Sequence, residues 1–144
     1  MQTTMKINLR KVHENATLPT YAKEGDACMD ITAVDYNMTD KYVEYDSGIA
    51  IEIPEGYVGI MRPRSSVSGY DLLWKTSGVI DSGYRGTLKG RFQIVEGEEK
   101  RKMYKVGERF AQLMIIPYPS IEFVEVQELS ETERGEGGFG HTGS

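Results

Sequence analysis

The spacing of apolar residues restricts the fold of this chain most strongly, because it follows a period of two. Residues 49–53 alternate so that three isoleucines share one face of an extended strand. Residues 54–56, Pro-Glu-Gly, are typical of a turn. Residues 57–61 are therefore expected to return as the partner strand. Residues 112–116 and 121–126 are predicted to form two further strands.

Helices are expected to be almost absent from the fold. No window of about 12 residues carries the apolar stripe of an amphipathic helix. The best helical candidate is a short turn that opens at Ser65 and Ser66, whose hydroxyls can cap exposed backbone amides. Short strands separated by turn residues indicate an all-β sandwich or barrel, and 144 residues suffice for one such domain.

Composition excludes several classes of protein. Hydrophobic residues make up 39% and charged residues 27% of the chain, which is typical of a globular domain rather than a disordered one. A formal net charge of −5 argues against a sequence-blind binder of duplex nucleic acid. One cysteine and two histidines argue against a disulfide framework and a zinc site. Because no apolar leader or membrane-spanning stretch is evident, we expect a cytoplasmic protein with no nucleic-acid or membrane partner.

Charge is distributed unevenly along the chain. Residues 62–109 hold 11 basic and 6 acidic side chains, whereas residues 1–61 and 110–144 each carry a net charge of −5. A basic middle between acidic ends can attract a compact anion such as a phosphate group. The alternative is an ordinary solvated loop, because residues 100–105 supply four of the basic charges. Charge alone leaves both interpretations open.

The C-terminal residues 134–144 contain five glycines and little apolar surface, so they are expected to be mobile unless a ligand orders them. Successive amides of residues 137–143 can approach an anion closely, as in a phosphate cradle. Arg134 adds a forked donor for phosphate oxygens, and Phe139 can stack on a base. The alternative is a terminus without a role. We treat residues 1–133 as the β-barrel domain and residues 134–144 as an arm of that domain.

Three further places carry residues suited to phosphate or water chemistry. Residues 64–66, Arg-Ser-Ser, end a strand and begin a turn that can bind phosphate, although ordinary capping explains the same residues. Asp81 lies in an expected hairpin, residues 78–86, where its carboxylate can deprotonate a water or merely form the turn. Asp30 can hold the water shell of a metal ion or belong to a turn. Cys28 is best interpreted as a small packed residue.

These places, taken in order, resemble the trimeric dUTPase family, which carries five short motifs in a fixed sequence. The resemblance covers most of the chain, from about Leu18 to Gly143. The five motifs stand at residues 22–30, 63–66, 78–86, 107–113 and 134–143. Any one of them is a weak signal, but the ordered set is highly specific.

The resemblance implies a jelly-roll-like β barrel, a homotrimer with shared active sites, and hydrolysis of dUTP to dUMP and pyrophosphate with Mg²⁺. Asp81 matches the carboxylate that orients the water attacking the α-phosphorus. Tyr84 matches the aromatic residue that packs under the deoxyribose and excludes a 2′-hydroxyl. Main-chain groups around Gly78, Ile80 and Lys89 are expected to bind uracil.

The remaining matches concern the triphosphate and its metal ion. Arg64, Ser65 and Ser66 match the triphosphate-binding turn, and Gln112 matches a contact to a phosphate or to the catalytic water. Asp30 matches the acidic residue that holds water ligands of the magnesium. The arm expected to close over uracil and the terminal phosphates includes Arg134, Phe139, Gly140, His141 and Thr142.

The chain departs from the family pattern at three places. Cys28 and Met29 stand where the family commonly has Gly-Tyr, which is expected to alter packing. Gly83 replaces a frequent Asp and loosens one turn contact. His141 replaces a usual Ser, so one hydroxyl contact to phosphate is lost and a protonated imidazole can supply a charged one.

Two alternative functions fit the same scaffold. A dCTP deaminase of this fold carries its catalytic glutamate ten residues after the motif aspartate, and Arg91 occupies that position here. A non-catalytic nucleotide-binding protein is expected to have lost Asp81 or the arm, and both are present. The resemblance therefore favours dUTP hydrolysis.

Overall fold

The computed structural model describes residues 4–95 and 102–138 of the chain. Within these residues the secondary structure consists of short strands and one 3-10 helix, so the predicted all-β class is confirmed. No helix among them has the length and apolar character needed to cross a membrane. The elements are β1 (Asn8–Lys11), β2 (Met29–Thr32), β3 (Asp35–Met38), β4 (Tyr42–Asp46), β5 (Ile49–Glu52), β6 (Tyr57–Arg62), η1 (Ser65–Gly69), β7 (Leu72–Trp74), β8 (Val79–Ile80), β9 (Lys89–Ile94) and β10 (Arg109–Pro117).

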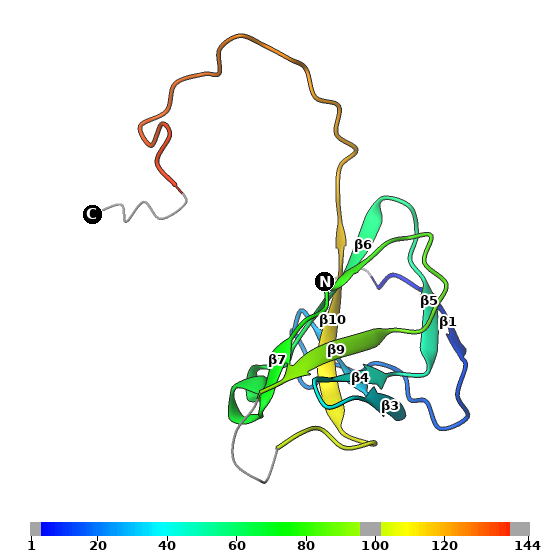
Figure 1. Cartoon of the computed structure of the whole chain (residues 1–144). Helices are drawn as coiled ribbons and strands as arrows, with labels where there is room; N and C mark the ends of the chain where they lie inside the picture. The colour runs from blue at the N-terminus through cyan, green and yellow to red at the C-terminus, as the bar shows by residue number, and fades with distance from the viewer. Residues whose placement is uncertain (1–3, 96–101, 139–144) are drawn as a thin grey trace.

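The strands form two four-stranded sheets and one two-stranded sheet (Figure 1). One four-stranded sheet has the order β2-β10-β6-β8, the other has the order β3-β4-β9-β7, and β1 pairs with β5. All of these pairs are antiparallel. The nine-residue β10 lies between β2 and β6, and it therefore brings the motif on β10 beside the motifs on its two neighbours.

The strands predicted at residues 49–53, 57–61 and 112–116 are confirmed as β5, β6 and β10. The predicted pairing of the first two is wrong, because β5 pairs with β1 while β6 pairs with β10 and β8. The turn between β5 and β6 passes the chain from one sheet to another. Gly56 has a φ of +86° there, and its carbonyl accepts a hydrogen bond from the Tyr118 amide at 2.9 Å.

The strand predicted at residues 121–126 is wrong. This segment continues from β10 away from the body of the protein (Figure 1), and it forms no strand in the described structure. Its apolar side chains face solvent, with Phe123 95% exposed and Val124 77% exposed. A strand requires a neighbour for its backbone hydrogen bonds, and residues 4–95 and 102–138 contain no strand that pairs with this segment.

Aromatic side chains fill the core between the sheets. Tyr45, Phe92 and Phe110 are almost fully buried. The Tyr45 ring centroid lies 5.8 Å from that of Phe92 and 5.4 Å from that of Phe110. The Tyr45 hydroxyl donates to the Tyr104 carbonyl at 2.7 Å, which satisfies its polar end inside the core. Burial also raises the pKa of Tyr45, so its hydroxyl stays protonated.

Candidate active site

The register of the β2-β10-β6 sheet brings three of the five motifs together. Asp30 on β2 lies opposite Gln112 on β10, and Gln112 lies opposite Arg62 on β6. The side-chain amide of Gln112 donates to the Pro63 carbonyl at 3.3 Å. Arg64 follows directly, so Asp30, Gln112 and Arg64 form one cluster at the end of β6.

The Asp30 carboxylate is the electrostatic centre of this cluster. Its side chain is 11% exposed. Arg64 Nε lies 3.1 Å from one carboxylate oxygen, and Arg109 Nη1 lies 3.3 Å from the other. Guanidinium groups carry several N–H donors, so each arginine keeps donors for a second anion while the carboxylate fixes its direction. The arrangement can hold a phosphate group beside Asp30.

Arg109 was not singled out by the sequence analysis, although it lies in the motif at residues 107–113. Residues three apart on a regular strand face opposite sides, which separates Arg109 from Gln112. A register shift between Arg109 and Ala111 interrupts that alternation, and the Arg109 side chain reaches Asp30. The bulge leaves no mark in the amino-acid pattern. The basic residue inside a motif was the only available signal.

The helical turn predicted at Ser65 and Ser66 is confirmed as η1. The predicted capping by their hydroxyls is wrong, because the N-cap position is Arg64 and no side chain caps it. Ser66 Oγ instead lies 3.3 Å from the Tyr104 hydroxyl, and the Ser68 hydroxyl donates to the Ser65 carbonyl at 3.2 Å. Ser65 and Ser66 lie inside the turn and not at its N-cap position, so their hydroxyls take other partners or face solvent.

The segment at residues 78–86 is a loop between two sheets and not the predicted hairpin. β8 at its start pairs with β6, whereas β9 beyond it pairs with β4 and β7. Gly78 has a φ of +77°, and its carbonyl accepts a hydrogen bond from the Met61 amide at 2.6 Å. A Cβ at Gly78 would lie 2.2 Å from the Met61 carbonyl oxygen, so only glycine fits. This close contact fixes the start of the loop.

Asp81 is exposed and follows Ile80, which pairs with Gly59 of β6. The Asp81 carbonyl accepts a hydrogen bond from the Tyr84 amide at 3.1 Å, so the two residues form one turn. The Tyr84 hydroxyl donates to the Thr87 carbonyl at 2.8 Å, and its ring remains 42% exposed. Hydrogen bonds within the loop therefore hold a carboxylate and a flat apolar ring at the surface.

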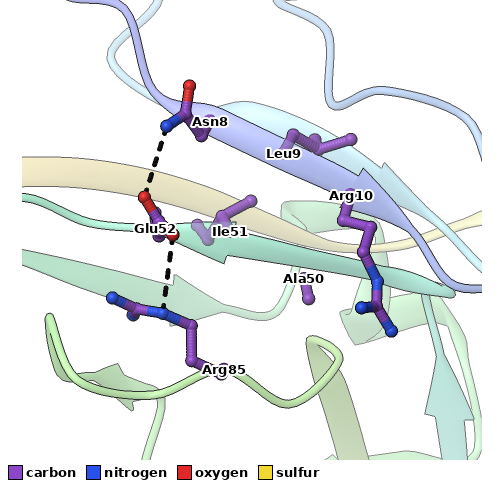
Figure 2. A pocket seen from close by; sticks show the side chains of 7 residues that line it. All are labelled: Asn8, Leu9, Arg10, Ala50, Ile51, Glu52 and Arg85. Atoms are coloured by element: carbon purple, nitrogen blue, oxygen red, sulfur yellow. Dashed lines mark hydrogen bonds and ion pairs between the residues drawn. The ribbon is translucent and has the colours of Figure 1, made fainter.

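Arg85 supports this loop from its outer side. Its Nη1 donates to the Ser82 carbonyl at 2.6 Å, and its Nε lies 3.8 Å from the Glu52 carboxylate. Figure 2 shows that Asn8 reaches the same carboxylate, at 3.2 Å. The pocket drawn there, with a volume of about 270 Å³, is lined by Arg85 but not by Asp81 or Tyr84.

One chain does not bring Asp81 to the Asp30 cluster. Ile80 lies opposite Gly59, three residues along β6 from Arg62, which spans about 10 Å. The strands are antiparallel, so Asp81 lies still farther from Arg62. Lys89, at the start of β9, lies opposite Asp46 in the other four-stranded sheet.

The described part of the arm also lies apart from this cluster (Figure 1). Arg134 folds back on its own segment, where its Nε donates to the Gly137 carbonyl and its carbonyl accepts from the Gly137 amide. The Gly135 amide donates to the Thr132 hydroxyl at 3.1 Å. The other predicted arm residues, Phe139, Gly140, His141 and Thr142, lie outside the described residues.

Cys28 and Met29, which depart from the family pattern, lie just before Asp30. Cys28 is half-buried, and burial followed by the charges of Asp26 and Asp30 raises the pKa of its thiol. Met29 packs against the core. The raised pKa favours the protonated thiol, and Met29 contributes to packing.

The donor set near Asp30 suits a hydrated magnesium ion better than a protein-enclosed metal. Among residues 4–95 and 102–138, no three His, Cys, Asp or Glu side chains gather closely enough to hold a metal ion. Asp30 offers a carboxylate at a place where a phosphate can bind. Mg²⁺ commonly takes one or two carboxylates, substrate phosphates and several waters. The residues present fit that mode of binding.

Comparison with known proteins identifies the family. Residues 14–143 match the family model described as dUTPase. The chain belongs to the dUTPase family. It is 40% identical over 145 residues to the deoxyuridine 5′-triphosphate nucleotidohydrolase of Hydrogenobaculum sp. strain Y04AAS1, covering 96% of this chain and 99% of that one. It is 41% identical to the protein of the same name from Clostridium tetani, covering 97% of each chain.

Solved structures of the dUTPase family share this fold. The dUTPase of Staphylococcus bacteriophage 80alpha, solved with dUPNHPP, superimposes with a TM-score of 0.78 at 32% identity, over 98% of this chain and 100% of that one. A mutant dUTPase of phage phi11 of S. aureus, whose structure reveals how a structural Mg(II) ion is coordinated, has a TM-score of 0.71 at 26% identity, over 86% of this chain and 98% of that one. The expected jelly-roll-like β fold is confirmed.

Proposed function

We propose that the chain hydrolyses dUTP to dUMP and pyrophosphate in the presence of Mg²⁺. The observation that carries this proposal is its full-length match to relatives named for dUTP hydrolysis, over 96% of this chain and 99% of the first. The match to the family model, residues 14–143, includes all five motifs. The cluster supports it, because Arg64 and Gln112 carry donors suited to a triphosphate and Asp30 fixes the direction of Arg64.

Asp81 acts as the general base in this proposal. Its carboxylate is exposed at the end of β8, and the loop hydrogen bonds fix its backbone. It holds a water by hydrogen bonding and accepts its proton as the oxygen attacks the α-phosphorus. The bond from that phosphorus to the bridging oxygen breaks, and pyrophosphate leaves with the electron pair. The products are dUMP and pyrophosphate.

The loop that carries Asp81 also selects the nucleoside. Tyr84 packs its exposed ring under the deoxyribose, where a 2′-hydroxyl would collide with it. Main-chain groups from Gly78 and Ile80 to Lys89 bind the uracil edge. Gly78 keeps this backbone in place, because any side chain there would collide with Met61.

The Asp30 cluster and the arm bind the phosphates. Arg64 is directed by Asp30, and Ser65 and Ser66 offer hydroxyls from the same turn. Arg134, together with Phe139, Gly140, His141 and Thr142 of the arm, closes over the uracil and the terminal phosphates. Gln112 contacts a phosphate or the catalytic water. Asp30 would hold Mg²⁺ through water, and the ion would neutralise charge on the leaving pyrophosphate.

We further propose that three copies of the chain share each active site. In one chain, Asp81 follows Ile80, which lies opposite Gly59 of β6. Gly59 lies three residues along β6 from Arg62, so Asp81 does not reach the Arg64 turn. A head-to-tail ring closing at three joins the Asp81 loop of one copy to the Arg64 turn of a neighbour. Leu129 and Phe123 are 86% and 95% exposed on the extended segment, and packing on another copy would remove that apolar surface from water.

Substrate selectivity tests the proposed function. We expect rapid release of pyrophosphate from dUTP with Mg²⁺ and rates at least about tenfold lower from dTTP, dCTP and UTP. The 5-methyl group of thymine collides with the loop backbone, and the ribose hydroxyl collides with Tyr84. A coupled pyrophosphate assay with each nucleotide, with EDTA as the control, measures this. Comparable turnover of dTTP would contradict the selectivity, and no turnover of any nucleotide would contradict the function.

A further inference from the structure

Tyr104 contacts both ends of the turn that contains Arg64, Ser65 and Ser66. Near the start of η1, its hydroxyl lies 3.3 Å from Ser66 Oγ. At the end of η1, its ring stacks on Tyr70 with the centroids 4.1 Å apart and the planes 22° apart. The Tyr70 amide in turn donates to the Val67 carbonyl and closes the turn.

The position of Tyr104 is itself fixed by the core. The side chain is 4% exposed, and its ring meets Tyr45 edge-on at 5.9 Å. Its carbonyl accepts the Tyr45 hydroxyl at 2.7 Å. A residue held by stacking, an edge contact and a main-chain hydrogen bond has little freedom to move. Its hydroxyl is therefore a fixed point against which Ser66 can be oriented.

The direction of the hydrogen bond follows from what each hydroxyl can do. Among the described residues, Ser66 Oγ is the only hydrogen-bond partner of the Tyr104 hydroxyl. A buried O–H that donates to nothing is costly, so Tyr104 donates to Ser66. Burial raises the pKa of Tyr104, which keeps that proton in place. The exposed Ser66 hydroxyl then accepts from Tyr104, and its own hydrogen remains free to donate to another acceptor.

We propose that Tyr104 is a positioning residue for triphosphate binding, because its hydroxyl orients Ser66 to donate to a phosphate oxygen. A phosphate oxygen accepts hydrogen bonds and cannot donate them, so this is the one orientation in which Ser66 binds it. Two hydroxyls in series also polarise each other, which strengthens the outer bond. The inference rests on the proposed function and adds a residue that lies outside the five motifs.

A double-mutant cycle tests this role. Tyr104→Phe keeps the ring and removes only the hydroxyl, and Ser66→Ala removes the second hydroxyl. Each is expected to weaken binding of the dUTP analogue dUpNHpp (also written dUPNHPP), measured by calorimetry with Mg²⁺, by about threefold to tenfold. The double variant is expected to bind no more weakly than the weaker single variant, because both changes break the same chain of hydrogen bonds. Inhibition by deoxyuridine, which has no phosphate, should not change.

Tyr70→Phe is the matched control. It removes a tyrosine hydroxyl from the same stack, and that hydroxyl makes no hydrogen bond in the part of the chain that the structure describes. It should bind dUpNHpp as the unmodified protein does. Unchanged dUpNHpp affinity in Tyr104→Phe would overturn the role of Tyr104 but leave the proposed function standing. The same follows if the affinity loss of the double variant equals the product of the two single losses. Failure of the unmodified protein to bind dUpNHpp would overturn the proposed function as well.

Discussion

Asp81→Asn is expected to lower kcat for dUTP hydrolysis by at least about 10²–10⁴-fold. Asparagine keeps the shape of aspartate and can still form hydrogen bonds, but its amide cannot accept a proton from the attacking water. Asp81 is exposed and follows the β8 pairing with β6, so the change disturbs no packed side chain. The variant should therefore fold normally and bind dUpNHpp with unchanged affinity. Steady-state kinetics and calorimetry measure the two effects separately.

Asp40→Asn provides a matched control. Asp40 is exposed in the connection between β3 and β4, away from the motifs, and its substitution makes the same chemical change. This control should keep the kcat of the unmodified protein. Near-normal turnover in Asp81→Asn would remove Asp81 from the mechanism, whereas loss of dUpNHpp binding would show that Asp81 acts in binding.

Ending the chain after Glu133 is expected to lower kcat/KM by roughly 10²-fold or more while the melting temperature changes little. The removed segment contains Arg134 and the rest of the arm, and these groups stabilise the phosphates in the proposed reaction. Residues 134–138, the part of this segment that the structure describes, include no residue of the hydrophobic core. Kinetics with dUTP and thermal unfolding of the same preparation give the two values.

A chain ending after Gly143 serves as the control, because it lacks only Ser144 and keeps every arm residue that is assigned a contact with the substrate. It should match the full chain in both measurements. A large fall in melting temperature after removal of residues 134–144 would show that the segment stabilises the fold. Unchanged kcat/KM would show that the arm has no part in turnover.

The sequence correctly predicted the positions of three strands, at residues 49–53, 57–61 and 112–116, but not how the first two pair. The alternation in residues 49–53 and 57–61 predicts extended structure correctly, because each segment buries one face. The Pro-Glu-Gly turn between them also fits a hairpin, and nothing local distinguishes a hairpin from a crossing between sheets. The same ambiguity explains the loop at residues 78–86, whose two flanking strands belong to different sheets.

The segment at residues 121–126 was mispredicted for a different reason. Its alternating pattern is typical of a strand, but a strand exists only where a partner supplies hydrogen bonds. The described residues of the isolated chain offer no such partner, and Phe123 remains exposed. If another copy supplies that partner, the pattern reports a property of the assembly rather than of the isolated chain.

Only the resemblance to a known family indicated that the candidate site residues belong together. Asp30, Arg64 and Gln112 come from three distant motifs, and the β2-β10-β6 register is what brings them together. Arg109 joins them through a bulge that the sequence does not show. Tyr104 lies outside every motif, and its contact with Ser66 depends on how the core packs around it. Such contacts follow from three-dimensional packing and have no local signature.

In the proposed trimer, dUTP is hydrolysed at a site that more than one copy of the chain completes. Co-refolding equal amounts of an Asp81→Asn chain and a chain ending after Glu133 tests it most directly. Each parent is expected to be inactive, but random mixing in a three-membered ring pairs an intact Asp81 with an intact arm of another copy in about a quarter of sites. We expect about a quarter of full activity to return in the whole refolded population, in which native mass spectrometry verifies that mixed trimers have formed. Activity that stays at the level of the parents in such trimers would contradict it.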